Sequence, residues 1–150
     1  MPDQPINFEE YLAKYGSLTY RNKGVSMMPL LKQGRDLFTL VPKGPERCRK
    51  YDVVLYKNRE GSYVLHRIIK VRGDSYVIRG DNTYHNEHRK DSDIIGVMSS
   101  FVHNGKNGSV DDFWYKVYVR INMLTYPLRW LCFRGRLYAA ALLKKTKGQR

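Results

Sequence analysis

The sequence predicts a mainly β protein, in which one antiparallel β domain lies between a short N-terminal helix and a basic helical C-terminal tail. Runs rich in Val, Ile, Leu and Tyr recur from about residue 17 to residue 103, and turn residues bound them. After residue 111 the apolar residues change to helical spacing. The chain has 150 residues, of which 42% are hydrophobic, so it is long and apolar enough to bury the core of one domain.

A short amphipathic helix is predicted over residues 7–15, within a first segment of residues 1–16. Asn7 can cap this helix, and Glu10 stands three residues later, at the capping-box position. Gly16 is expected to end it. Phe8, Leu12 and Tyr15 fall on one face of this helix.

The β domain is predicted to span residues 17–108. Gly73-Asp74 stands between two β-like runs and is a two-residue hairpin signal. Proline, glycine and asparagine mark residues 42–45 and 104–108 as loops. The expected strands cover residues 37–41, 53–56, 63–71, 75–78 and 94–102.

The tail, residues 109–150, is predicted to be helical, with Pro127 kinking or splitting it. Its apolar residues recur at helical spacing, at Phe113, Val117, Ile121, Leu124, Leu131, Leu137, Ala141 and Leu142. Such a basic amphipathic helix is typical of a segment lying in the headgroup plane of a membrane, with rings at the interface from Trp114, Tyr118 and Trp130. The alternative is a helix pair that packs on the β domain and leaves a solvated basic face.

The chain contains 27 Lys and Arg residues against 14 Asp and Glu residues, which gives a formal net charge of +13. Such an excess indicates an anionic partner, of which nucleic acid, anionic lipid and acidic peptide are the candidates. We favour an anionic membrane surface bound through residues 111–150 over nucleic acid. Residues 1–14 do not resemble a signal peptide, and no window reaches the ~18 uncharged apolar residues of a spanning helix. These features predict a cytoplasmic location at the membrane surface.

Four short motifs carry the residues that could perform chemistry. Ser26 lies in Gly24-Val25-Ser26-Met27-Met28-Pro29, and His66 begins His66-Arg67-Ile68-Ile69. Gly80-Asp81-Asn82 and Ile94-Ile95-Gly96 follow. A serine hydroxyl needs a nearby base to become a nucleophile, and a neutral imidazole is well matched to that task. Taken separately, the serine reads as a turn residue and the histidine as a core residue of its strand.

In their order and spacing, these motifs resemble the catalytic boxes of signal peptidase I, in the archaeal and endoplasmic-reticulum branch that uses histidine as its base. The resemblance covers roughly residues 25–102 and implies the fold of the signal peptidase and LexA-like clan. It implies a serine endopeptidase that cuts a signal or leader peptide, with Ser26 as nucleophile, His66 as base and no cofactor. For the carboxylate that orients His66, we rank Asp81 first and Glu87 second.

The same resemblance assigns supporting roles to Gly24, Met27, Pro29 and Asn82 around the nucleophile and the oxyanion. Many relatives have a hydroxyl residue at the position of Gly24, so a side-chain donor to the oxyanion is absent here.

Two other functions remain open on the sequence. One is a LexA-like self-cleaving regulator, although the 25 residues before Ser26 hold no helix-turn-helix. The other is a non-catalytic protein that binds lipid or nucleic acid on a degenerate peptidase fold. A metal site is not predicted, because the crowded polar loop lacks the H-E-x-x-H spacing; its residues are His85, Glu87, His88, Asp91 and Asp93.

Overall fold

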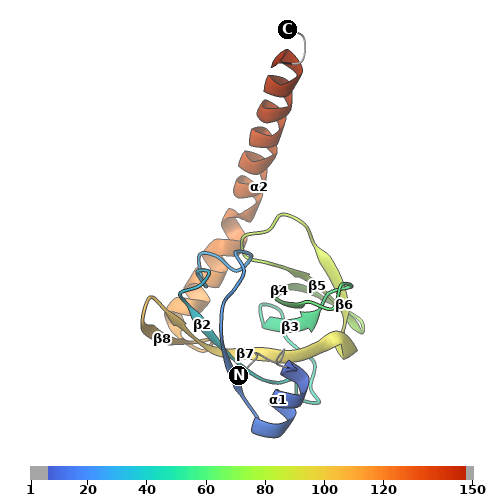
Figure 1. Cartoon of the computed structure of the whole chain (residues 1–150), viewed down its shortest axis with the longest axis vertical. Helices are drawn as coiled ribbons and strands as arrows, with labels where there is room; N and C mark the ends of the chain where they lie inside the picture. The colour runs from blue at the N-terminus through green and yellow to red at the C-terminus, as the bar shows by residue number, and fades with distance from the viewer. Residues whose placement is uncertain (1–6, 148–150) are drawn as a thin grey trace, which may run out of the picture. The chain divides into compact units, whose positions relative to one another are not determined.

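A computed structural model describes residues 7–147, without the side chains of residues 142–147. One antiparallel sheet, curled into a half-barrel, forms most of the first of two compact units, which ends at Tyr115 (Figure 1). Its strands are β1 (Leu18–Arg21), β2 (Leu37–Pro42), β3 (Val53–Lys57), β4 (Tyr63–Arg72), β5 (Ser75–Arg79), β6 (Glu87–Lys90), β7 (Ile94–His103) and β8 (Lys106–Ser109). Two helices, α1 (Phe8–Tyr15) and α2 (Phe113–Lys147), and a single 3-10 turn, Asp91–Asp93, complete the described elements. The predicted fold class is confirmed.

The strands pair in the order β1-β2-β7-β3-β4-β5-β6, and β8 pairs with β7. All five strands expected from the sequence are present, and each begins at its expected residue. The Gly73-Asp74 hairpin joins β4 to β5 and pairs Arg72 with Ser75. The prediction of a loop over residues 104–108 was wrong, because β8 begins at Lys106. Asn104 and Gly105 both have positive φ and turn the chain back, so that the polar strand β8 pairs with β7.

Helix α1 forms as its sequence predicts. The Asn7 side chain accepts hydrogen bonds from the backbone N–H groups of Glu9 and Glu10, and Gly16 ends the helix in the left-handed conformation. Of the three apolar residues predicted on one face, Phe8 and Leu12 are buried, whereas Tyr15 in the last turn is 58% exposed.

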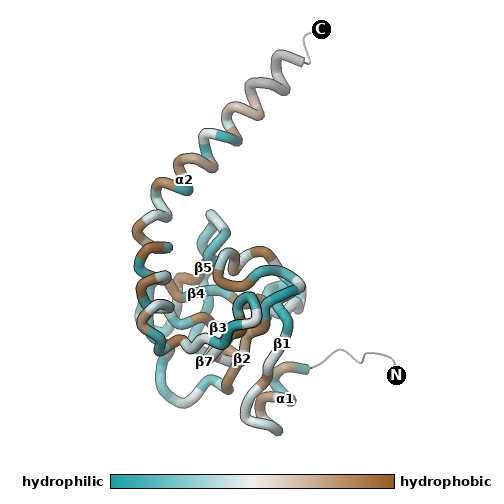
Figure 2. Tube along the Cα trace, turned by 90° about the vertical axis from the view of Figure 1, so that its left-hand side faces the viewer, coloured by the Kyte–Doolittle hydropathy of each residue, from teal (hydrophilic) through white to brown (hydrophobic). Residues whose placement is uncertain are grey.

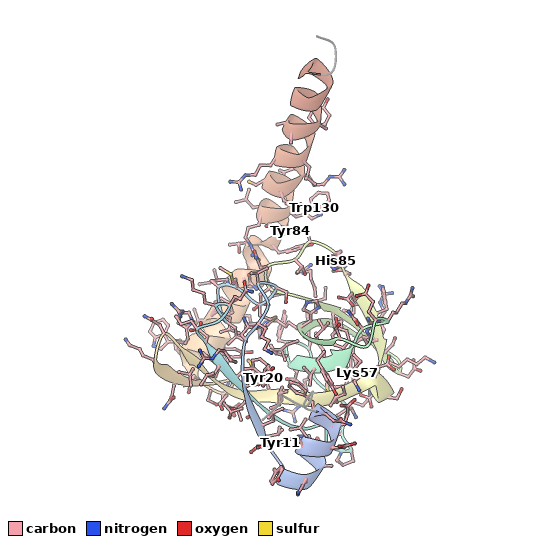
Figure 3. The ribbon with its side chains drawn as sticks, viewed as in Figure 1. Tyr11, Tyr20, Lys57, Tyr84, His85 and Trp130 are labelled. Carbon is pink, nitrogen blue, oxygen red and sulfur yellow. The ribbon has the colours of Figure 1, made fainter. Side chains whose placement is uncertain are left out.

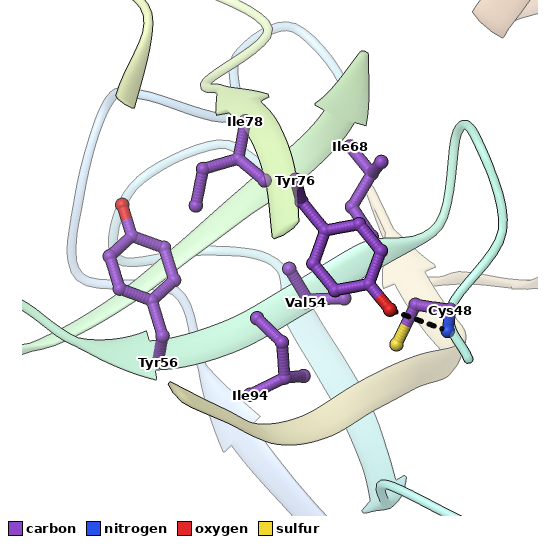
Figure 4. Packing of buried hydrophobic residues seen from close by; sticks show 7 residues of the cluster. All are labelled: Cys48, Val54, Tyr56, Ile68, Tyr76, Ile78 and Ile94. Carbon is purple, nitrogen blue, oxygen red and sulfur yellow. Dashed lines mark hydrogen bonds between the residues drawn. The ribbon is translucent and has the colours of Figure 1, made fainter. Parts of the chain in front are cut away.

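The core of the sheet gathers side chains from β3, β4, β5 and β7 (Figure 4). Its buried members are Cys48, Val54, Tyr56, Ile68, Tyr76, Ile78 and Ile94. Two of these are tyrosines, and burial of a hydroxyl requires a hydrogen-bond partner. The Tyr76 hydroxyl accepts from the Cys48 backbone N–H at 3.0 Å and donates to Asp91. Tyr56 directs its hydroxyl toward the candidate site.

Helix α2 runs from Phe113 to Lys147 as one element with Pro127 inside it, so the tail is not split at the proline. Hydrophobic and hydrophilic residues alternate along it (Figure 2). None of the described helices combines the length and the apolar character needed to cross a bilayer.

Candidate active site

A turn over residues 26–30 presents Ser26 between β1 and β2. The buried Asn22 side chain donates to the carbonyl oxygens of Gly24 and Leu31, at 2.7 and 2.9 Å. These bonds fix the backbone on both sides of Ser26, whose side chain is half-buried. The turn is anchored to the core by buried apolar side chains, which are Met27, Leu30 and Leu31. Pro29 is exposed, and the Met28–Pro29 peptide bond is cis.

His66 lies on β4, opposite Val54 of β3, and its residue is only 5% exposed. Its Nδ1 atom lies 3.0 Å from the Tyr56 hydroxyl and 3.2 Å from Glu87 Oε1. Tyr56 and Glu87 are themselves hydrogen-bonded. A carboxylate can only accept hydrogen bonds, so its contact with Nδ1 places the ring proton there. Nε2 is then left with a lone pair that can take a proton from a nucleophile.

Gly80 brings the serine and the histidine together. A methyl group placed on Gly80 would stand 3.0 Å from both His66 Nε2 and Ser26 Cβ, so these two atoms are no more than twice that distance apart. The same methyl group would lie 2.6 Å from the Ser26 carbonyl oxygen, which explains why this position needs glycine. In the described chain no hydrogen bond joins Ser26 to His66. Catalytic hydrogen bonds are often long before substrate binds.

Asn82 ties the two segments together from the other side. Its backbone N–H donates to the Ser26 carbonyl oxygen at 2.8 Å, and its side-chain amide donates to the Val25 carbonyl oxygen at 3.2 Å. The Gly-Asp-Asn segment therefore holds the serine turn against the histidine strand.

Asp81, predicted first among the acids to orient His66, binds the buried Arg67. Both of its carboxylate oxygens accept hydrogen bonds from the Arg67 guanidinium, at 2.8 and 2.7 Å, and both side chains are fully buried. Arg67 also donates to the Tyr51 carbonyl oxygen and to the Tyr115 hydroxyl. The carboxylate that touches the His66 ring is that of Glu87, so the contacts reverse the expected order of the two acids.

Burial keeps the pKa of His66 below its ordinary value, because a desolvated imidazolium is disfavoured. The Glu87 carboxylate acts in the opposite direction and raises the pKa of His66 in part. Glu87 is in turn held by Arg89 at 2.9 Å, and the Arg89 guanidinium lies 4.7 Å from the centre of the Tyr56 ring. Burial beside Glu87 also raises the pKa of the Tyr56 hydroxyl, which therefore stays protonated and acts as a donor.

Residue 24, where many signal peptidases have a hydroxyl side chain, is glycine and supplies no side-chain donor. A Cβ added to Gly24 would have only Ser26 Oγ within 4 Å, at 4.0 Å. A hydroxyl side chain at this position would begin near the nucleophile, and Gly24 leaves that space open.

A cleft of about 390 Å³ contains Ser26 and is mostly apolar. Its walls come from α1, β1, β2, β3 and β4, and they include Phe8, Tyr20, Phe38, Leu55 and Leu65. Tyr20 is marked on β1 in Figure 3. A larger depression of about 650 Å³ lies away from the serine, where Lys43 pairs with Asp91 at 2.8 Å. Of these two, the cleft at Ser26 is the one that contains the candidate nucleophile.

The acidic and histidine side chains in and around β6 do not converge on one point. His85, marked in Figure 3, is exposed and lies 4.0 Å from Glu87. Asp91 binds Lys43 and Tyr76, and Asp93 accepts from the Lys90 backbone N–H. Within the described residues, no group of three or more His, Cys, Asp or Glu side chains is placed to hold a metal ion.

Sequence reasoning overlooked Tyr56, Asn22 and the buried role of Arg67. Tyr56 reaches His66 because β3 and β4 pair with Val54 opposite His66, a register that alternation within one strand does not reveal. Asn22 shows no motif at all. Arg67 could have been noticed, because a charge in the middle of an apolar strand needs a buried partner.

No protein-family model matches this chain, and no curated protein matches its sequence significantly.

Proposed function

We propose that this protein is a serine endopeptidase of the signal peptidase type, with Ser26 as nucleophile and His66 as general base. The observation that carries the proposal is the meeting of Ser26 and His66 Nε2 around Gly80, with Glu87 on the far side of the imidazole ring. A buried histidine with one nitrogen oriented and the other directed toward a serine is the arrangement that nucleophilic catalysis needs.

The reaction follows from these positions. Ser26 Oγ attacks the carbonyl carbon of the scissile peptide bond while its proton passes to His66 Nε2. Glu87 stabilises the imidazolium through Nδ1–H, and the Ser26 backbone N–H donates to the oxyanion. His66 then gives the proton to the leaving amine as the C–N bond breaks. A water molecule attacks the acyl-enzyme by the same route and regenerates Ser26.

The cleft supports an extended peptide as substrate. Among the described strands, β1 has a neighbour on one side only, β2, and residues from β1 line the cleft that contains Ser26. An extended peptide can add to such a sheet edge through backbone hydrogen bonds while its apolar side chains enter the cleft. These features fit a signal or leader peptide, and we propose a cytoplasmic enzyme that processes one.

The test is cleavage of a mixed library of extended peptides, with new termini identified by mass spectrometry. Ser26→Ala and His66→Ala should each abolish every cleavage made by the wild type, because loss of either member of the unit costs ~10⁶-fold in turnover. Ser62→Ala is the matched control, since Ser62 is exposed in the turn between β3 and β4. Cleavage that survives Ser26→Ala, or a wild type that cleaves no peptide, would contradict the proposal. A wild type that cleaves no peptide would favour a non-catalytic protein, which is consistent with the missing side-chain donor at Gly24.

A further inference from the structure

Helix α2 carries an uninterrupted apolar stripe. Its residues are spaced four, four, three, four and three apart, which follows one face of an α-helix. The stripe consists of Phe113, Val117, Ile121, Leu124, Leu128 and Leu131. Apart from the half-buried Val117, its members are between 55% and 80% exposed. Exposure of such a row of large apolar side chains to water is unfavourable, and contiguous apolar surfaces of this kind mark binding sites.

Basic side chains border this stripe on both sides. At 3.6 residues per turn, Lys116, Arg120 and Arg134 fall along one border, and Arg136 lies beyond the other. Arg129 is on that second side too, but it is half-buried and donates to the Asn122 carbonyl oxygen at 3.0 Å. Nitrogen-tipped side chains extend from α2 in Figure 3. After Asp112 the sequence contains nine Lys or Arg residues and no Asp or Glu. The helix thus pairs an apolar stripe with charge of one sign.

We propose that the α2 stripe binds an anionic lipid bilayer side-on, with the apolar residues among the acyl chains and the flanking cations at the headgroups. If the stripe bound a protein, the residues beside it on α2 would be expected to include some acidic ones. A negatively charged lipid surface is instead complementary to a border whose charges are all basic. Long basic side chains can bury their stems and keep their charges at the interface. The proposal does not depend on the peptidase assignment.

The position of the two tryptophans gives the proposal a geometric consequence. The chain has only Trp114 and Trp130, and both lie on α2. They are sixteen residues apart, which is about four and a half turns, so they fall on opposite faces. Trp114 borders the stripe and is 77% exposed, whereas Trp130 lies away from it with Arg134 over its ring at 5.2 Å. We therefore expect Trp114 alone to insert into the bilayer, rather than both tryptophan rings.

The experiment uses the full chain with vesicles of phosphatidylcholine that contain or lack about one third phosphatidylglycerol. Trp130→Phe leaves Trp114 as the sole tryptophan, and Trp114→Phe leaves Trp130. We expect anionic vesicles to shift the emission of Trp114 to shorter wavelength and to allow its quenching by brominated acyl chains. Trp130 should change little. Equal quenching of the two rings, or binding to neutral vesicles with the same affinity, would overturn the proposal.

A pair of matched double variants tests the stripe itself. Leu124→Glu with Leu131→Glu changes the stripe, and Phe133→Glu with Leu137→Glu makes the same charge change at exposed apolar residues of another face. We expect the first pair to reduce co-sedimentation with anionic vesicles at least ~10-fold more than the second. Equal reductions would overturn the proposal. So would a wild-type dimer in sedimentation velocity that only the first pair dissociates, because the stripe would then bind a second copy of this chain.

Discussion

Arg67 and Asp81 form a fully buried, two-pronged ion pair, and each stands one residue after a member of the candidate site. Arg67 follows His66 on β4, and Asp81 follows Gly80 at the end of β5. The pair therefore fixes the distance between the strand that carries the histidine and the segment that supports Ser26. We propose that this pair positions His66 and Ser26, the proposed base and nucleophile, while Glu87 contacts the imidazole ring.

The two acids should consequently respond differently to amide substitution. Asp81→Asn leaves the buried Arg67 charge uncompensated, which is expected to cost about 3–5 kcal/mol of unfolding free energy. Glu87→Gln should leave stability nearly unchanged and lower kcat by up to ~10⁴-fold, because a neutral amide replaces the carboxylate that fixes the tautomer of His66 and stabilises its imidazolium. Urea denaturation and kcat of both variants give the answer. A stable but inactive Asp81→Asn together with an active Glu87→Gln would instead indicate that Asp81, not Glu87, orients His66.

The pH dependence of kcat/KM should report His66. The lowered pKa of His66 keeps the ring neutral down to a pH below its ordinary value of 6.5, and only the neutral ring accepts a proton. Activity should therefore rise with pH through a midpoint below 6.5 and remain level through neutrality. Glu87→Gln removes a carboxylate that raises this pKa, so the midpoint of its residual activity should move lower still. A rate that climbs beyond about pH 9 would instead indicate a lysine base.

The same shift has a consequence for stability. In the folded protein His66 resists protonation, whereas in the unfolded chain it protonates near pH 6.5. The unfolded state thus binds more protons as the pH falls from 6.5 toward the lowered pKa, and the contribution of His66 to stability decreases across that window. His66→Gln should flatten this part of the stability profile, as measured by thermal unfolding at closely spaced pH values. An unchanged profile in His66→Gln would contradict the assigned direction.

Tyr56 is expected to be a positioning residue for His66. Tyr56→Phe removes only the hydroxyl at Nδ1, so kcat should fall by about tenfold, the equivalent of one hydrogen bond. Tyr76→Phe is the matched control, because it deletes a buried tyrosine hydroxyl from the same core cluster. Both variants should lose stability, but only Tyr56→Phe should alter the proton resonance of the His66 ring. An unchanged resonance in Tyr56→Phe would leave the hydroxyl with a structural role only.

Periodicity and turn chemistry account for what the sequence could predict. The five predicted strands are runs of β-branched and aromatic residues, and the helix α1 has a cap at each end. Among the strands that were not predicted, β1 is only four residues long, and β6 and β8 have no such signal. β6 reads Glu87-His88-Arg89-Lys90, and only its pairing with β5, with Glu87 opposite Ile78, makes it a strand. That same register brings Glu87 into the sheet beside His66, so the missed strand and the reversed order of the acids have one cause.

The absence of a side chain at Gly80 should be essential to activity. In Gly80→Ala the new methyl group would meet the Ser26 carbonyl oxygen at 2.6 Å and His66 Nε2 at 3.0 Å, so one segment must move. A displacement of that kind can cost ~10²-fold in turnover. Gly24→Ala is the control, since its methyl group has only the Ser26 hydroxyl nearby, at ordinary contact distance. Equal activity of the two variants would mean that the serine turn and the histidine strand need not touch.

Gly24→Ser should increase activity. The oxyanion beside Ser26 is proposed to rely on backbone donors, and one good donor is worth ~10²–10³-fold in turnover. A side chain at residue 24 would start 4.0 Å from Ser26 Oγ with no other obstacle within 4 Å, so a hydroxyl there has room to reach the developing negative charge. We expect kcat to rise by about tenfold, less than a native donor contributes, because the added hydroxyl is not held in place. Gly24→Ala supplies the same Cβ without the donor and should remain at the wild-type rate. If Gly24→Ala and Gly24→Ser are equally active, the oxyanion does not form beside residue 24, and the orientation of the peptide carbonyl in the cleft must be reassigned.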